Sequence, residues 1–140
     1  MGHFVTSETS RKSKWWIPKY RFLELKYFCL QYPEWKREAY DLMLISGASV
    51  SIQNEIGSQL EFKDPTGNTA IRFQDLNSKI SLVVKIAQLS DEDIGDFILK
   101  AVTENLSFVK LKTLYEIPCE RDMYYDRYRK FFFLLSRQKN

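Results

Sequence analysis

The stretch that decides the fold is SFVKLKTLYEIPCERDMYYDRYRKFFFLLSRQKN, residues 107–140. A short amphipathic segment comes first, followed by the turn Glu116-Ile117-Pro118 and a long segment crowded with Arg, Lys, Tyr and Phe. Proline suits the first position of a helix, so Pro118 marks where a second helix can start. We therefore predict a helix-turn-helix over residues 107–137, in which one helix holds another at a steep angle, as DNA-binding motifs require.

The two helices of this stretch have distinct apolar and polar sides. Ser107 is expected to cap the first helix, and Ile117 is expected to fill the angle between the two. The residues expected to face inward are Phe108, Leu111 and Leu114 in the first helix, and Tyr124, Tyr128, Phe131 and Leu135 in the second, which should run from Cys119 to about Arg137. The opposite side of the second helix carries Asp122, Tyr125, Asp126, Arg129, Lys130 and Phe133.

This polar side provides candidate DNA contacts. Recognition helices contact bases mainly from their first turns, where Arg121 can donate two hydrogen bonds to guanine and Tyr125 can bond a phosphate or stack on a methyl group. Phosphate contacts position a protein without specifying a sequence. The basic residues suited to that role are Lys110, Lys112, Arg129 and Lys130.

A simpler interpretation also fits, in which the charges of an amphipathic C-terminal helix only keep it in solution. Asp122 and Asp126 lie among the basic residues and would repel phosphates. Phe133 lies on the polar side, where an aromatic ring can mark a dimer contact or a partner site.

Apolar periodicity predicts two helices in the first third of the chain. One is expected at 19–32, with a buried stripe of Tyr20, Leu23, Tyr27 and Leu30. Pro33 interrupts it and suits the first position of the next helix. That second helix is expected at about 33–45, with Trp35, Ala39, Leu42 and Met43 inward.

The middle of the chain predicts two more helices. A long one at about 68–89 has heptad-like spacing of Phe73, Leu76, Ile80, Val83 and Ala87, which suits either core packing or a coiled-coil dimer. Ser90 is expected to cap the next helix, which Asn105 can end in left-handed geometry. Its expected buried face is Ile94, Phe97, Ile98, Ala101 and Val102. The predicted fold class is therefore mainly α.

Two segments fall outside this helical pattern. Residues 1–18 are rich in Ser, Thr, Arg and Lys and are expected to form a flexible basic arm. The arm can contact DNA, or it can be a loose leader whose Trp15 and Trp16 cover the core. Residues 46–65 predict a long loop, and their loose alternation also allows a small β-hairpin at about 49–63.

Composition indicates one globular helical domain at 19–140. The chain has 140 residues, of which 44% are hydrophobic and 15% aromatic, so a core can form. The net charge is only +3, but residues 46–106 have nine acidic and five basic residues, whereas residues 107–140 have four acidic and eight basic. A basic C-terminal third is what contact with phosphates requires. No apolar run is long enough to span a membrane, and no signal peptide is apparent.

Neither a metal site nor a catalytic site is expected. Cys29 and Cys119 lie far apart and His3 is the only histidine, so a zinc site lacks ligands. Cys29 is expected to be a buried, reduced thiol, which suits the cytoplasm. The acids lie at helix caps or on helix exteriors, and no phosphate-binding glycine loop or nucleophile elbow is present. We therefore expect a protein without cofactors that is not an enzyme.

Several segments resemble a known family. They are Ala101-Val102-Thr103-Glu104, Leu111-Lys112-Thr113-Leu114, Ile117-Pro118-Cys119, the tyrosine-arginine block from Tyr124 to Phe132, and, more weakly, Asp64-Pro65-Thr66 and Tyr32-Pro33. Together they are similar to RinA/ArpU-like phage transcriptional regulators of Gram-positive mobile elements. The resemblance spans about residues 19–137 and implies a helix-turn-helix of the sigma-factor region 4 kind. The chain departs from the family at Glu116, where glycine is common. It also departs around Pro118-Cys119-Glu120, where the segment that starts the second helix has one more residue.

The residues predict a cytoplasmic DNA-binding protein, and the resemblance implies a transcriptional regulator of a phage or mobile element in a bacterial host. Its expected partner is double-stranded DNA, with a homodimer or a position beside RNA polymerase as the resemblance implies. The alternative is a mobile-element protein that binds and inhibits a host nuclease or adapts the transcription machinery. The acidic middle segment, the loop at 46–65 and Phe133 favour that alternative.

Overall fold

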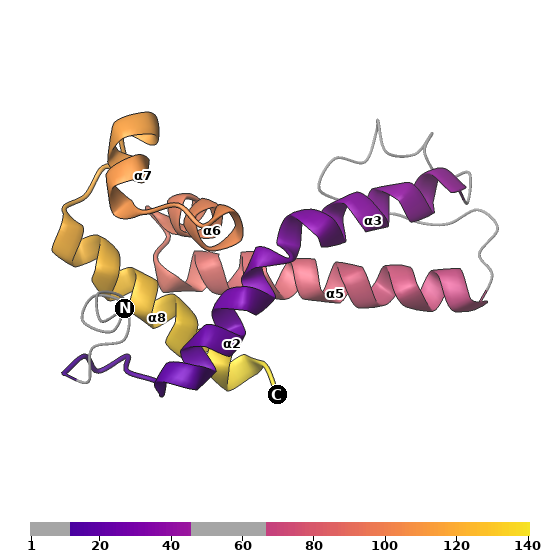
Figure 1. Ribbon diagram of the computed structural model, residues 1–140, viewed down its shortest axis with the longest axis horizontal. Coiled ribbons are helices and arrows are strands. Elements are labelled where there is room, and N and C mark those ends of the chain that lie inside the picture. The colour runs from indigo at the N-terminus through magenta and orange to yellow at the C-terminus, as the bar shows by residue number, and fades with distance from the viewer. Residues whose placement is uncertain (1–11, 46–66) are drawn as a thin grey trace. The chain divides into compact units, whose positions relative to one another are not determined.

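The computed structural model describes residues 12–45 and 67–140 of the chain. These residues are mainly helical, as predicted, and contain no strand. The helices are α2 (Lys19–Leu30), α3 (Tyr32–Ile45), α5 (Gly67–Ser90), α6 (Gly95–Glu104), α7 (Phe108–Tyr115) and α8 (Arg121–Gln138) (Figure 1). The β-hairpin considered at about 49–63 lies outside the described residues.

The chain divides into two compact units. One contains the chain up to Gln31 together with Leu82–Asn140, and the other contains Tyr32–Ser81. The division expected from sequence, an arm at 1–18 and one domain at 19–140, stays a prediction.

The smaller unit pairs α3 with the first part of α5. Its buried residues are Trp35, Ala39, Met43, Phe73 and Leu76, all of which were predicted to face inward. At its surface, the guanidinium of Arg72 contacts both carboxylate oxygens of Glu38 at 2.7 and 2.8 Å. The Lys79 ammonium lies 5.7 Å from the centroid of the Trp35 ring. An apolar seam therefore joins the two helices, and exposed charges line its edge.

The larger unit is built around α8. Helix α2 packs against α6 and α8, and α6 packs against α7 and α8. The close approach of α6 to the end of α5 depends on Gly95, because a Cβ atom there would lie 2.8 Å from the carbonyl oxygen of Ala87. The thiol of Cys29 is buried in this unit, as expected, and burial raises its pKa.

The buried side of α2 differs from the prediction. Tyr20 and Tyr27 were expected to be buried, but they are 78% and 62% exposed. The core is instead entered by Phe22, Leu25 and Cys29. The helix is apolar on more than one side, and packing against α6 and α8 selects the side without phenol hydroxyls, which would need hydrogen-bond partners if buried.

The corner between α5 and α6 also corrects the sequence analysis. Ser90 does not cap α6. It is the last residue of α5, and its hydroxyl donates a hydrogen bond to the carbonyl of Ala87 at 2.6 Å. The carboxylate of Asp91 instead accepts hydrogen bonds from the amides of Asp93 and Ile94 at 2.7 and 3.0 Å in the turn before α6, and the N-cap residue of α6, Ile94, makes no side-chain capping hydrogen bond. Helix α6 therefore starts at Gly95, several residues later than expected.

The end of α6 follows the prediction. Asn105 adopts left-handed geometry with φ 58°, and its amide and that of Leu106 donate to the carbonyl of Ala101. Asparagine tolerates this conformation better than most residues. In the described parts of the chain, no helix is both long and apolar enough to cross a lipid bilayer.

Candidate nucleic-acid interface

Helix α7 is fixed at its start by the predicted cap. The hydroxyl of Ser107 accepts a hydrogen bond from the amide of Lys110 at 3.2 Å. Phe108 and Leu111 are buried, as expected, but Leu114 is 62% exposed, contrary to the prediction. The chain turns directly after Tyr115, and Ile117, which was expected to fill the angle between the two helices, is fully buried.

The turn after α7 uses an unfavourable residue. Glu116 has φ 53°, and its amide and that of Ile117 both donate to the carbonyl of Leu111. A residue with a Cβ atom loses roughly 1–2 kcal/mol in this left-handed conformation, which glycine adopts freely. The side chain of Lys112 supports the turn by donating to the carbonyl of Ile117 at 3.2 Å.

Helix α8 starts at Arg121, two residues after the expected Cys119. Glu120 is extended, with φ −84° and ψ 165°, and its side chain accepts no capping hydrogen bond. Cys119 is buried in the connection, where burial raises the pKa of its thiol. Two residues that were assigned to the helix therefore belong to the turn, and Arg121 occupies the first helical position.

The inner side of α8 is an aromatic face. The four residues predicted to be buried are buried: Tyr124, Tyr128, Phe131 and Leu135. Phe132 is buried as well and packs edge-on against Phe22 of α2, with ring centroids 4.9 Å apart. The sequence analysis missed Phe132, although the run Phe131-Phe132-Phe133 already indicated a wider apolar face.

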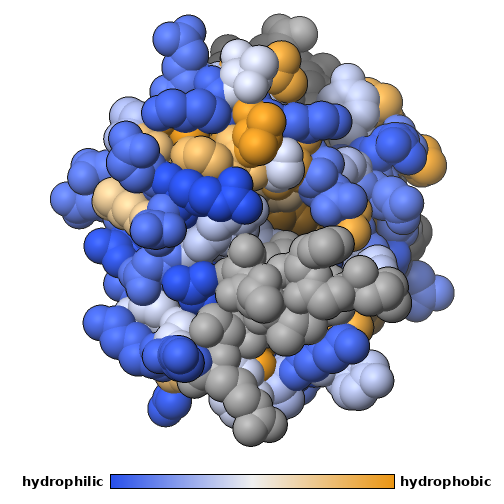
Figure 2. Space-filling view, turned by 60° about the vertical axis from the view of Figure 1, so that its left-hand side comes forward, coloured by the Kyte–Doolittle hydropathy of each residue, from blue (hydrophilic) through white to orange (hydrophobic). Residues whose placement is uncertain are grey.

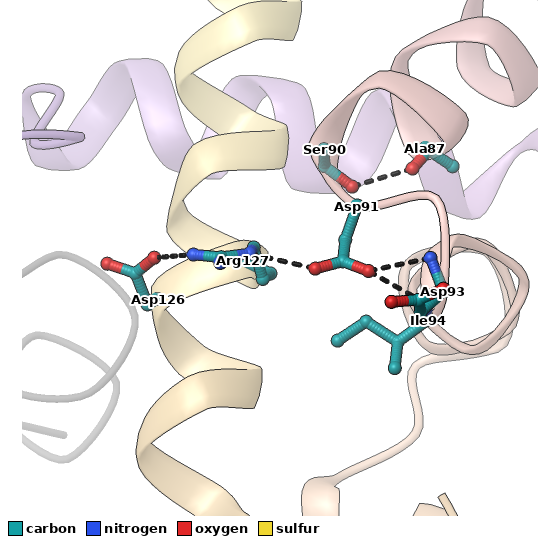
Figure 3. Close-up of polar contacts among 7 residues, drawn as sticks. All are labelled: Ala87, Ser90, Asp91, Asp93, Ile94, Asp126 and Arg127. Atoms are coloured by element: carbon teal, nitrogen blue, oxygen red, sulfur yellow. Dashed lines mark hydrogen bonds and ion pairs between the residues drawn. The ribbon is translucent and has the colours of Figure 1, made fainter. Parts of the chain in front are cut away.

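Arg127 is a second residue that the sequence analysis did not single out. Its Nε donates to a carboxylate oxygen of Asp91 at 2.9 Å, and its guanidinium also pairs with Asp126 (Figure 3). Burial acts to raise the pKa of Asp91, but hydrogen bonds from the Ile94 amide, Arg127 and the Asp93 amide outweigh it and lower that pKa. Arg127 thereby joins α8 to the α5–α6 corner.

One group of predicted site residues lies beside the turn. Lys110, Lys112 and Arg121 are exposed, and Tyr125 is half-buried. The guanidinium carbon of Arg121 lies 5.3 Å from the centroid of the Tyr125 ring, which packs edge-on against Tyr124. We call these four residues the turn-side surface.

Acidic residues accompany the turn-side surface. Glu116, Glu120 and Asp122 are exposed along the same stretch of chain. The carboxylate of Asp126, which was expected to repel phosphates, is instead occupied by Arg127. The net charge beside the turn is therefore close to neutral.

The remaining predicted residues lie further along α8. Arg129 and Lys130 are half-buried, and the Nε atom of Arg129 lies beneath the surface. The Lys130 ammonium lies 5.4 Å from the centroid of the Trp15 ring. Trp15 also packs edge-on on Phe133, which explains this aromatic residue on the polar side of the helix.

Apolar side chains are exposed on α7. Val109 and Leu114 are largely exposed, and Tyr115 is partly exposed, with the Lys100 ammonium 4.8 Å from its ring centroid. In the space-filling view that brings α7 and α8 forward, hydrophobic side chains are visible among hydrophilic ones in the upper part of the molecule (Figure 2).

The described residues contain no cluster of three or more His, Cys, Asp or Glu side chains that could bind a metal ion. The chain matches no known family model, no curated protein and no solved structure.

Proposed function

We propose that the protein is a sequence-specific DNA-binding regulator in which α7, the turn and α8 act as a helix-turn-helix. The observation that supports this most is Arg121, an exposed arginine in the first turn of a helix whose inner face is fully packed. We also propose that it acts on transcription in a phage or mobile element, as its resemblance to RinA/ArpU-like regulators implies.

The packing of α8 suits recognition. Tyr124, Tyr128 and Phe132 fix one side of the helix, so its first turn is presented outward with little conformational freedom. A guanidinium pre-ordered on the Tyr125 ring retains its donors for the edge of guanine, and such bidentate contacts discriminate between bases by about 1–3 kcal/mol. Asp122 can accept a hydrogen bond from cytosine.

The test is a binding-site selection with the full chain, followed by affinity measurements on the selected duplex and a scrambled one. Arg121→Ala and Tyr125→Ala should reduce the preference for the selected duplex over the scrambled one. For Arg121→Ala, the difference in binding free energy between the two duplexes should fall by about 1–3 kcal/mol. Lys110→Ala should weaken binding to both duplexes alike. Lys110 is a better phosphate probe than Lys112, because Lys112→Ala also removes the hydrogen bond that supports the turn.

If all three variants leave both affinities unchanged, the turn-side surface does not contact DNA. Binding by the unaltered chain should also weaken steeply between about 50 and 200 mM salt, because phosphate contacts release counterions.

A second proposal is supported by the exposed apolar side chains of α7. A protein that inhibits a host nuclease or adapts the transcription machinery needs exposed apolar contacts, and Val109 and Leu114 can each provide one. Phe133 no longer supports this alternative, because Trp15 packs on it. A pull-down from host lysate with nuclease treatment distinguishes the two functions. A captured protein that is lost with Leu114→Ser, together with no DNA affinity, would favour the second proposal.

A further inference from the structure

Basic residues concentrate where the start of the described chain meets the second half of α8. Residues 12–21 contain four Lys and Arg residues and no acid, and residues 127–140 contain five and no acid. Arg21 joins the two segments by donating to the hydroxyl and the carbonyl of Ser136, both at 3.0 Å. Two acid-free segments far apart in the sequence therefore lie side by side.

A chain of ring contacts orders the cations in this region. The Lys14 and Lys130 ammonium groups lie 4.9 and 5.4 Å from the centroid of the Trp15 ring. Trp15 packs edge-on on Phe133 with centroids 5.4 Å apart, and the guanidinium carbon of Arg137 lies 5.5 Å from the Phe133 ring. We call these five residues the arm-side surface.

The three cations of the arm-side surface contact aromatic rings. Nearby, Arg21 pairs with Glu24 at 3.0 Å, and Arg127 pairs with Asp91 and Asp126. The contacts of Lys14, Lys130 and Arg137 described above are to aromatic rings, which leave a cation its charge and its remaining donors.

We propose that the arm-side surface binds the phosphate backbone of double-stranded DNA as a second contact region beside the turn-side surface. This inference rests on the proposed function for the identity of the polyanion. Three cations spaced along one helix and the segment packed on it suit successive phosphates of a rigid duplex. The contacts are independent of sequence and contribute affinity rather than specificity.

The experiment measures affinity of the full chain for a mixed-sequence duplex across salt concentrations. The test variant combines Lys14→Gln, Lys130→Gln and Arg137→Gln. Each phosphate contact contributes about 0.9 to the slope of log affinity against log salt, so the slope should become shallower by about 2.7. Three such contacts correspond to a change of about 40-fold in affinity between about 50 and 200 mM salt.

The matched control combines Lys36→Gln, Arg37→Gln and Lys85→Gln, which removes the same charge from exposed positions on α3 and α5. It should change the slope far less than the test variant. A charge-preserving variant with Lys14→Arg, Lys130→Arg and Arg137→Lys should bind as the unaltered chain does. Equal slopes for the test and control variants would overturn the proposal.

The outcomes separate this inference from the proposed function. If the test variant loses slope while Arg121→Ala leaves sequence preference intact, the arm-side surface binds DNA and the recognition role of α8 is wrong. If Arg121→Ala abolishes preference while the test variant keeps its slope, only the arm-side proposal is wrong. Binding to vesicles of equal parts phosphatidylcholine and phosphatidylserine, without DNA affinity, would overturn both and indicate an anionic membrane instead.

Discussion

The region beside the turn and the second half of α8 have different chemistry. Beside the turn, Arg121 and two lysines are interspersed with Glu116, Glu120 and Asp122. Along the second half, no acid follows Asp126, and Lys130 and Arg137 lie near the rings of Trp15 and Phe133, respectively. Mixed charge suits discrimination, because a wrongly placed phosphate is repelled, whereas uniform positive charge suits affinity. Under the proposed function, the region beside the turn would therefore provide specificity, and the second half of α8 would provide affinity.

Both regions depend on the buried aromatic face of α8, so a substitution in that face should have the largest effect on stability. Phe132 is 1% exposed and packs on Phe22 and Tyr128, so Phe132→Ala should reduce the free energy of unfolding by about 3–5 kcal/mol. Both surfaces should then lose DNA binding together. Chemical denaturation measures the change.

Tyr20→Ala on the exposed side of α2 is the control for Phe132→Ala, and it should change stability by no more than about 0.5 kcal/mol. A Phe132→Ala protein of normal stability would show that the aromatic face does not hold α8.

The next largest effect should come from the contact between α8 and the α5–α6 corner. Asp91→Asn weakens the ion pair with Arg127 and the two amide contacts, and should cost about 2 kcal/mol at about pH 7. The pKa of Asp91 is lowered in the folded protein, so its contribution is present above the unfolded value of about 3.9 and is lost as the pH falls through the folded value.

The stability difference between the unaltered chain and Asp91→Asn should therefore shrink as the pH falls below about 4. Urea titrations across that range measure it. A difference that stays constant with pH would mean that the carboxylate charge contributes nothing.

A smaller effect should arise at the turn, and it separates backbone strain from charge. Glu116→Gly relieves the left-handed conformation and should stabilise the protein by about 1 kcal/mol. Glu116→Ala removes the same charge but keeps the strain, so it should not stabilise. Thermal unfolding of the two variants provides the comparison. If Glu116→Gly and Glu116→Ala were equally stable, any gain over the unaltered chain would come from the lost charge and not from relief of backbone strain.

The smallest effect sharpens the contrast between the two surfaces. Asp122→Asn should strengthen binding to every duplex by less than about 1 kcal/mol, because an exposed charge acts weakly through solvent. The preference between the selected and scrambled duplexes should fall at the same time. Anisotropy titrations at low salt measure both quantities, and a gain confined to the selected duplex would contradict the assigned role of Asp122.

Local patterns predicted much of the fold. Helical spacing located the buried face of α8, and cap chemistry located Ser107 and the left-handed Asn105. These features depend on residues close in sequence, so periodicity and hydrogen-bond preference are sufficient. The same reasoning failed for α2, where apolar residues on several sides left the choice of buried side to α6 and α8.

The parts of the candidate site that were missed depend on distant residues. In the sequence, nothing distinguishes Arg127 from the other cations of α8. In the structure, its Nε lies 2.9 Å from a carboxylate oxygen of Asp91, which is 36 positions earlier in the chain. Trp15 and Phe133 were noted separately, and only the packing of residues 12–18 on α8 joins them. No local pattern encodes such pairs, because their partners are chosen by tertiary contact.

The most direct test of the division along α8 is an NMR titration of the isotope-labelled full chain with the selected duplex. We expect amide shifts to change at Lys110, Arg121 and Tyr125, and separately at Lys14, Lys130 and Arg137, while those of Tyr20 and Tyr27 on α2 stay unchanged. Addition of salt should reverse the second group first. Shifts confined to α2, α3 or α5, or no shifts at all, would contradict the assignment of α8 as the DNA-binding helix.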